Sequence, residues 1–156
     1  MKKKLGALLV SVMFVVAGIC TATATKMTTT EADAALLQDI NDLRVSKGLN
    51  VVEGDVKLLE LAQIRAAEVL ELWSHDRPDG GSGCALVLAE VEGSLWAGEN
   101  LACLSRFSDR YEQIIFKALC DSQAHYDNFV YGNFTKCGVY TLQGEEKTVT
   151  VILFAG

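Results

Sequence analysis

Two β-rich segments at the C-terminal end of the chain restrict its fold more than any other feature. They are "FTKCGVYTL" (134–142) and "KTVTVILFAG" (147–156), and the short polar stretch "QGEE" (143–146) joins them. β-branched and aromatic residues on both sides of a glycine-containing connection predict a β-hairpin. A further strand is predicted in "SLWAGENLACL" (94–104), where Gly98 favours a bulge or a close approach of a neighbouring group.

Helical patterns dominate the sequence before the hairpin. We expect a first helix over about 30–47, opened by a capping box of Thr28 and Glu31 and stopped by Gly48. Apolar residues recur in it at the spacing of one helix face. These expected core positions are Leu36, Leu37, Ile40 and Leu43.

Two longer helices and one short helix are expected next. Asp55 is placed to cap a helix that ends near Trp73, and Ser108 is placed to open another. The apolar run "CALVLAEVEG" (84–93) could form a buried strand or a short helix, and we favour a helix closed by Gly93. The expected inward side chains are Leu58, Leu59, Ala62, Ala66, Val69, Leu70, Tyr111, Ile114, Ile115, Ala118 and Leu119.

A shorter helical segment, "HYDNFV" (125–130), precedes the hairpin. Helices therefore come first and most strands come late, and strands that follow one another closely pair antiparallel. This order predicts the α+β class.

The N-terminus has the three parts of a secretory signal peptide. A basic start (1–4) is followed by a fifteen-residue apolar run (5–19) and by the small residues Ala22-Thr23-Ala24. We interpret 1–24 as a signal peptide that is removed on export. The alternatives are an uncleaved membrane anchor, although the run is short for one, and a lipoprotein that begins at Cys20.

After the signal peptide we expect a flexible lead-in (25–29) and a single domain (30–156). Removing residues 1–24 takes away three lysines and no acid, so the formal charge of −6 becomes −9. An acidic domain disfavours nucleic acid as a partner, because phosphate binding needs a basic face. The expected location is secreted or extracellular, with membrane contact only through an uncleaved signal segment.

Four cysteines remain in the exported chain. An even number in an exported protein predicts two disulfides, with three connectivities open. The alternative is that they stay as buried free thiols, which behave as small apolar side chains. The four are Cys84, Cys103, Cys120 and Cys137.

Three polar segments could hold chemistry: "SHDRPDG" (74–80), "AGENLA" (97–102) and "SQAHYDNF" (122–129). Together they contain both histidines of the chain and a glutamate between glycine and asparagine. Two imidazoles with nearby carboxylates suit a divalent metal such as Zn²⁺. The HExxH pattern of zinc proteases is missing from the sequence.

The order of these motifs resembles one known family. "NDLRVSKGL", "SHDRPDG", "GENLA", "SQAHYDN" and the final strand pair are similar to the CAP superfamily of cysteine-rich secretory, antigen 5 and pathogenesis-related proteins, especially its small bacterial members. The resemblance covers about 30–156. It implies a three-layer α-β-α sandwich with a central antiparallel sheet and a large cleft that holds two histidines and two glutamates.

The resemblance also assigns site residues. His75, His125 and Glu99 correspond to three members of this set and are the candidate metal ligands. The second glutamate corresponds to Ser122 here, so one anionic group is lost. Asp121 and Glu112 are the acids that could replace it.

The other motif residues have a structural interpretation. Arg77 and Asp79 are expected to fix the loop around Pro78, and Asn100 and Asn128 to hydrogen-bond backbone groups near the site. Ser122 is also a natural cap for the helical segment that follows it.

Three hypotheses describe what the site does. The first is a non-enzymatic extracellular binding module, with lipid, sterol or an extracellular protein as partner and a divalent metal at the His/Glu cluster. The alternative is a metal-dependent hydrolase with Glu99 as general base and Ser122 beside His125, although only two good zinc ligands are visible where catalytic zinc generally keeps three. In the third, His75, Glu99 and His125 form a purely structural cluster.

Overall fold

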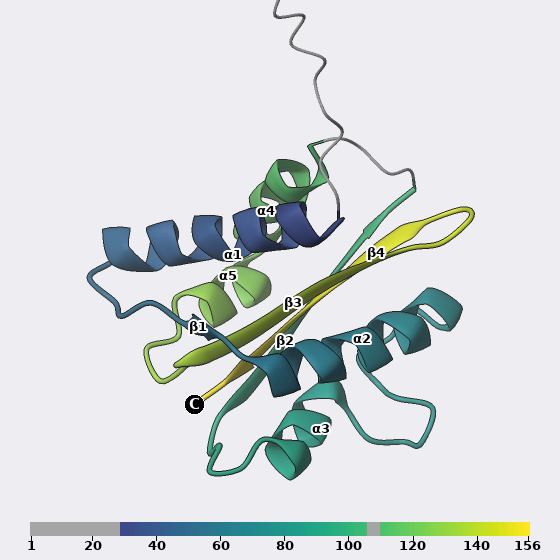
Figure 1. Cartoon of the computed structure of the whole chain (residues 1–156), viewed down its shortest axis with the longest axis horizontal. Helices are drawn as coiled ribbons and strands as arrows, with labels where there is room; N and C mark the ends of the chain where they lie inside the picture. Colours follow the sequence, from purple (N-terminus) through teal and green to yellow (C-terminus); the bar gives the residue numbers. More distant parts are fainter. Residues whose placement is uncertain (1–28, 106–109) are drawn as a thin grey trace, which may run out of the picture.

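The computed structural model of the chain describes residues 29–105 and 110–156. The predicted signal peptide, Thr28 and Ser108 lie outside the described residues. Figure 1 shows the elements in chain order. They are α1 (Thr29–Ser46), β1 (Glu53–Gly54), α2 (Val56–Glu71), α3 (Gly83–Glu90), β2 (Ala97–Leu104), α4 (Tyr111–Cys120), α5 (Gln123–Phe129), β3 (Lys136–Gln143) and β4 (Thr148–Ala155).

The sheet is built on the predicted hairpin, which is confirmed. β3 pairs antiparallel with β4, and β2 pairs antiparallel with the other side of β4. The strand order is β1-β3-β4-β2. The sheet is mixed rather than purely antiparallel, because the two-residue β1 pairs parallel with the start of β3.

Helices cover both faces of the sheet and complete the three-layer sandwich (Figure 1). The core on one face joins α1, α4 and α5 to the sheet, and the core on the other joins α2 and α3 to it. Alternate side chains of β4 serve the two cores: Ile152 and Phe154 face one, and Val151 and Leu153 the other. Every residue of β4 is buried, which explains its continuous apolar run.

The predicted helices and their caps are mostly confirmed. Asp55 Oδ1 accepts a hydrogen bond from the Leu58 N–H at 2.9 Å and so caps α2. Segment 84–93 forms the short helix α3. Gly48 and Gly93 adopt positive φ just beyond α1 and α3, where a left-handed residue ends a helix cheaply.

The prediction is wrong for three side chains that we expected in the core. Leu59 is 37% exposed and Ile114 is 47% exposed, and Ala118 is also exposed. A helix contributes only one stripe to a core. In α2 that stripe runs through Leu61 and Arg65, which are buried although the sequence pattern did not single them out.

Arg44, from the "NDLR" motif, ties α1 to the segment before β3. Its guanidinium is fully buried and donates to the carbonyls of Asn50, Phe129, Tyr131 and Phe134 at 2.8–3.0 Å. One side chain thus binds four backbone acceptors, and those of Phe129 and Phe134 are buried.

The four described cysteines are free thiols, so the predicted disulfides are not seen; Cys137 is buried, Cys84 and Cys120 are partly buried, and Cys103 is exposed. Cys120 and Cys137 belong to the core on the α1 face. Cys84 is the second residue of α3, on the other face, close to Glu99. Cys103 lies four residues further along the strand from Glu99, about 13 Å away. Burial raises the pKa of the Cys84, Cys120 and Cys137 thiols, which keeps them protonated.

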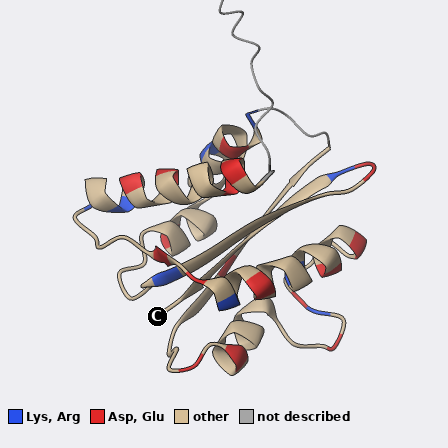
Figure 2. Ribbon diagram, in the orientation of Figure 1, with Lys and Arg blue, Asp and Glu red and all other residues tan. Residues whose placement is uncertain are grey.

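Charge is spread over both helical layers, and Asp and Glu positions occur on α1, α2 and α3 (Figure 2). In the part of the chain that the structure describes, no helix combines the length and apolarity needed to cross a bilayer.

Candidate functional site

The site is built around Glu99, in the edge strand β2. Its side chain is only 2% exposed, so its negative charge needs close partners. Arg65 of α2 supplies two of them: Nε lies 2.8 Å from Oε2, and Nη2 lies 3.2 Å from Oε1. This two-point pairing fixes the plane of the carboxylate.

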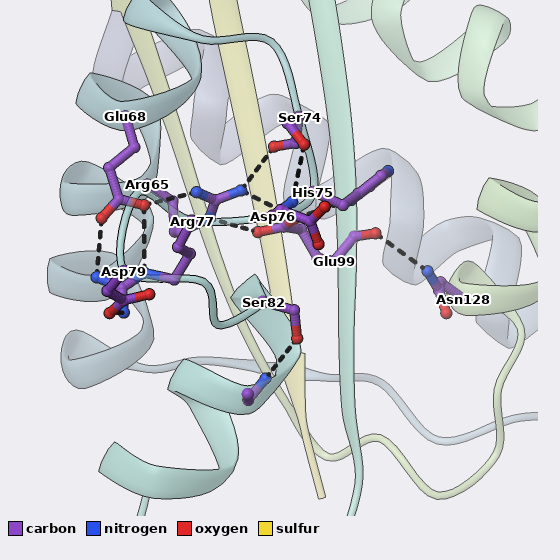
Figure 3. Close-up of polar contacts among 11 residues, drawn as sticks. Arg65, Glu68, Ser74, His75, Asp76, Arg77, Asp79, Ser82, Glu99 and Asn128 are labelled. Carbon is purple, nitrogen blue, oxygen red and sulfur yellow. Dashed lines mark hydrogen bonds and ion pairs between the residues drawn. The ribbon is translucent and has the colours of Figure 1, made fainter.

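Arg65 is itself fully buried and uses its remaining donors nearby. Nη1 lies 2.6 Å from Glu68 Oε2, and Nη2 donates to the Ser74 carbonyl at 3.0 Å. Burial alone lowers the pKa of Arg65, but hydrogen bonds to Glu99 and Glu68 outweigh it and the pKa is raised. Arg65 therefore stays charged, and it joins α2 to the loop that begins at Ser74 (Figure 3).

His75 follows Ser74 and turns its ring toward Glu99. Its Nδ1 lies 2.8 Å from Glu99 Oε1, and its side chain is 60% exposed. A carboxylate partner selects the tautomer with the proton on Nδ1. The Nε2 lone pair is then left for a ligand.

The loop after His75 is fixed by a chain of ion pairs. Arg77 bonds Glu68 at 2.8 and 3.2 Å and Asp79 at 2.6 Å, and Asp79 Oδ1 accepts from the Gly81 N–H at 2.9 Å. Burial raises the pKa of Glu68, but hydrogen bonds from Arg77 and Arg65 reverse the effect and lower it. Glu68 therefore links the loop to the Arg65–Glu99 pair (Figure 3).

Gly83, the first residue of α3, has a role that its sequence context did not indicate. Gly80, in the loop before α3, adopts a turn conformation with φ +84°, but Gly83 does not have a positive φ. A Cβ built at Gly83 would overlap the Glu99 carboxylate at Oε2. Only glycine leaves room for the buried acid.

His125 lies on the short helix α5 and is half-buried. Its Nδ1 lies 2.8 Å from Ser122 Oγ. Ser122 occupies the cap position of α5, but its hydroxyl makes no cap hydrogen bond. Burial lowers the pKa of His125, and its electrostatic interaction with His75 lowers it further. His125 is therefore electrostatically coupled to His75, which lies on the loop after α2.

Two asparagines fasten α5 to β2. Asn100 Nδ2 donates to the His125 carbonyl at 3.0 Å, and Asn128 Nδ2 donates to Asn100 Oδ1 at 2.7 Å. Asn128 also lies 3.4 Å from the Glu99 carbonyl. Gly98 permits this contact, because a Cβ there would press on Phe134 and on Asn128 Oδ1. The predicted close approach at Gly98 is confirmed.

Neither suggested replacement for the second glutamate joins the histidines. Asp121 is exposed and pairs with Lys117 at 2.5 Å, and Glu112 is buried in α4 with Oε2 lacking a partner in the described structure. Among the described residues, no three His, Cys, Asp or Glu side chains are grouped to hold a metal ion. The donors that remain for a metal are the two Nε2 atoms.

Arg65 and Glu68 are the site residues that sequence reasoning missed. The signal was available, because Arg65 stands within the apolar stripe that includes Leu58, Ala62 and Val69. A charged residue at a core position of a helix requires a buried partner of opposite charge.

The family of the chain follows from comparison with known proteins. The sequence profile of the cysteine-rich secretory protein family, CAP, matches residues 37–154. The chain therefore belongs to the CAP family. No curated protein sequence matches it.

Solved structures share the fold. An outer surface protein from Borrelia burgdorferi is 22% identical with a TM-score of 0.72, over 83% of this chain and 96% of that one. An extracellular SCP-domain protein from Bacillus anthracis is 21% identical with a TM-score of 0.59, over 80% of this chain and 42% of that one. NaASP2, solved with Zn²⁺, is 16% identical with a TM-score of 0.61, over 83% of this chain and 81% of that one.

Proposed function

We propose that this CAP domain is a secreted, non-enzymatic binding module that takes a divalent metal ion between His75 and His125. One observation supports this most strongly. Each imidazole is held at Nδ1 by another side chain, Glu99 in one case and Ser122 in the other. An oriented ring with a free Nε2 is the usual arrangement of a histidine that binds metal.

The donor set fits a metal held by two protein nitrogens. Zn²⁺ accepts neutral imidazole and prefers four ligands, so water or a group from a partner would complete the shell. The lowered pKa of His125 favours the neutral form that a metal requires. The structure of the similar protein NaASP2 was solved with Zn²⁺, which supports trying this ion first.

Glu99 favours binding over hydrolysis. A general base needs a carboxylate oxygen that can reach a water. Both oxygens of Glu99 are engaged by Arg65, Oε1 also faces His75, and the group is almost fully buried. The hydrolase alternative, with Glu99 as base and Ser122 beside His125, would require Glu99 to leave Arg65.

Isothermal titration of the domain with Zn²⁺ tests the proposal. We expect one site with a dissociation constant in the micromolar range, lost in both His75→Ala and His125→Ala. Gln123→Ala, an exposed change on α5, is the control and should bind like the original. If the original protein takes up no Zn²⁺, the cluster is structural and the metal proposal is wrong.

Export and partner are part of the same proposal. Proteins with the same fold include an outer surface protein and an extracellular protein, which supports a secreted location. The exposed side chains of Leu72 and Trp73 directly precede the His75 loop, and this apolar surface supports a lipid, sterol or extracellular protein as partner. Export predicts that the protein recovered outside the cell begins at Thr25, which N-terminal sequencing would test.

A further inference from the structure

A cavity of about 300 Å³ opens between α1, α2 and β3. It lies at the β3 edge of the sheet, whereas the Glu99 site lies at the β2 edge on the far side of β4. Its volume is at the small end of the range for ligand pockets. The proposed metal site does not use it.

The walls of this cavity are mainly apolar. Leu37 contributes from α1, Val56 and Leu59 from α2, and Val139 from β3. Val56 and Leu59 are 74% and 37% exposed. Leu59 matched the helical core pattern in the sequence, and its position on the cavity wall explains why it is not covered.

The cavity exists because the β3 edge is left uncovered by a strand. β1 pairs only with Lys136 and Cys137 and then ends at Gly54. Further along the edge, the Asp33 carboxylate accepts the Thr141 N–H at 3.0 Å. That bond occupies an edge donor that an added strand would need. A small molecule therefore fits this edge better than an extended peptide does.

Charge further restricts the ligand. Asp33 and Asp55 both line the cavity, and no Lys, Arg or His is among the described residues that line it. The cation beside Asp55 is Lys136, whose Nζ lies 3.8 Å from Asp55 Oδ2 and whose side chain is half-exposed. Figure 2 shows acidic positions on both helices that flank the opening. A carboxylate head group would be repelled here, and an ammonium group would be attracted.

We propose that this cavity binds a small amphipathic amine, with the alkyl or aryl body between Leu37 and Leu59 and the ammonium group toward Asp55. The body gains from leaving water, and the ammonium adds selectivity over neutral and anionic molecules of the same length. This proposal is independent of the metal site.

Three probes of equal length test it: hexylamine, hexanol and hexanoate, titrated into the ¹⁵N-labelled domain. We expect hexylamine to shift the amide signals of Gly138 and Tyr140, with a dissociation constant on the order of 1 mM for so short a chain. Hexanol should bind more weakly, and hexanoate weakest. Equal binding of hexanoate and hexylamine would overturn the charge assignment.

Matched variants locate the binding. Ala34 is exposed and lines the cavity, so Ala34→Trp should fill it and weaken hexylamine at least about tenfold, which corresponds to about 1.4 kcal/mol. Ala67→Trp, exposed on α2 outside the cavity, should leave binding unchanged. Asp55→Asn keeps a good helix cap and should weaken hexylamine about threefold while leaving hexanol unchanged. If Ala34→Trp melts at the same temperature as Ala67→Trp and still binds hexylamine as tightly as the original protein, the proposal is wrong.

Discussion

Arg65 and Glu99 form a buried two-point ion pair between α2 and β2, with nitrogen–oxygen distances of 2.8 and 3.2 Å. Neither residue belongs to a helix end or a turn, and both lie on rigid elements. The pair therefore holds the acid that orients His75 at a fixed place against the sheet. It connects the core of the domain to its candidate site.

Breaking this pair should be costly. Arg65→Met leaves the Glu99 charge buried without its main partner, and we expect unfolding free energy to fall by about 3–5 kcal/mol. Urea denaturation followed by circular dichroism measures the change. The double variant Arg65→Met with Glu99→Met should recover a large part of the loss, because the orphaned charge is gone. A single variant as stable as the original would show that the pair is not buried as described.

Gly83→Ala should destabilise the domain although alanine favours helices by about 0.5–1 kcal/mol. The new methyl group overlaps the Glu99 carboxylate, so we expect a net loss of about 1–3 kcal/mol together with weaker Zn²⁺ binding. Gly132→Ala is the matched control, because its Cβ would meet only Leu49 Cδ2 at 3.8 Å. Equal stability of the two variants in thermal melts would refute the claim that only glycine at position 83 leaves room for the Glu99 carboxylate.

Arg44→Lys should be far from conservative. Lysine keeps the charge but cannot reach four carbonyls with one planar group, so buried acceptors are left unpaired and we expect a loss of about 2–4 kcal/mol. Lys57→Ala, which breaks an exposed pair with Glu90, should cost less than about 1 kcal/mol. Chemical denaturation measures the loss of unfolding free energy in both variants. Similar losses in the two would contradict the role given to Arg44.

The lowered pKa of His125 predicts a specific loss of stability in acid. The unfolded chain, with an ordinary histidine pKa of about 6.5, takes up the proton before the folded one does. The contribution is therefore complete above that pH and is lost as pH falls toward the folded pKa. Without metal, the original protein should lose more stability between about pH 7.5 and 5.5 than His125→Gln. Parallel losses would mean that His125 is not desolvated.

Residue pattern predicted the layers of the fold, but it did not predict the partners of single residues. The hairpin and the helices could be predicted from periodicity, because a strand or helix with one buried face carries apolar residues at a regular spacing in the sequence. β1 was not predicted, because two residues show no period and their pairing depends on where β3 lies. Leu59 and Ile114 matched a helical stripe, but which side of that stripe meets the sheet is decided by tertiary packing.

The candidate site, like the fold, could be predicted from the sequence only in part. His75, Glu99 and His125 were selected from their motifs. The structure pairs His75 with Glu99, and it places His125 on α5, whose backbone Asn100 of β2 holds. Arg65 was not selected, although its place in the apolar stripe of α2 could have revealed it. Gly83 could not have been selected, because its role depends on where the Glu99 carboxylate points once β2 is packed. The disulfides predicted from an even cysteine count are absent among the described residues, since whether cysteines lie close enough to pair is a tertiary property.

The most direct test of the proposed site is the nitrogen NMR spectrum of the two imidazoles during Zn²⁺ titration. We predict that both Nε2 signals shift together with one equivalent of metal while both Nδ1 signals stay in place, since Nδ1 of His75 faces Glu99 and Nδ1 of His125 faces Ser122. Metal-induced shifts at either Nδ1, or no shift at either Nε2, would contradict the claim that His75 and His125 share a metal ion.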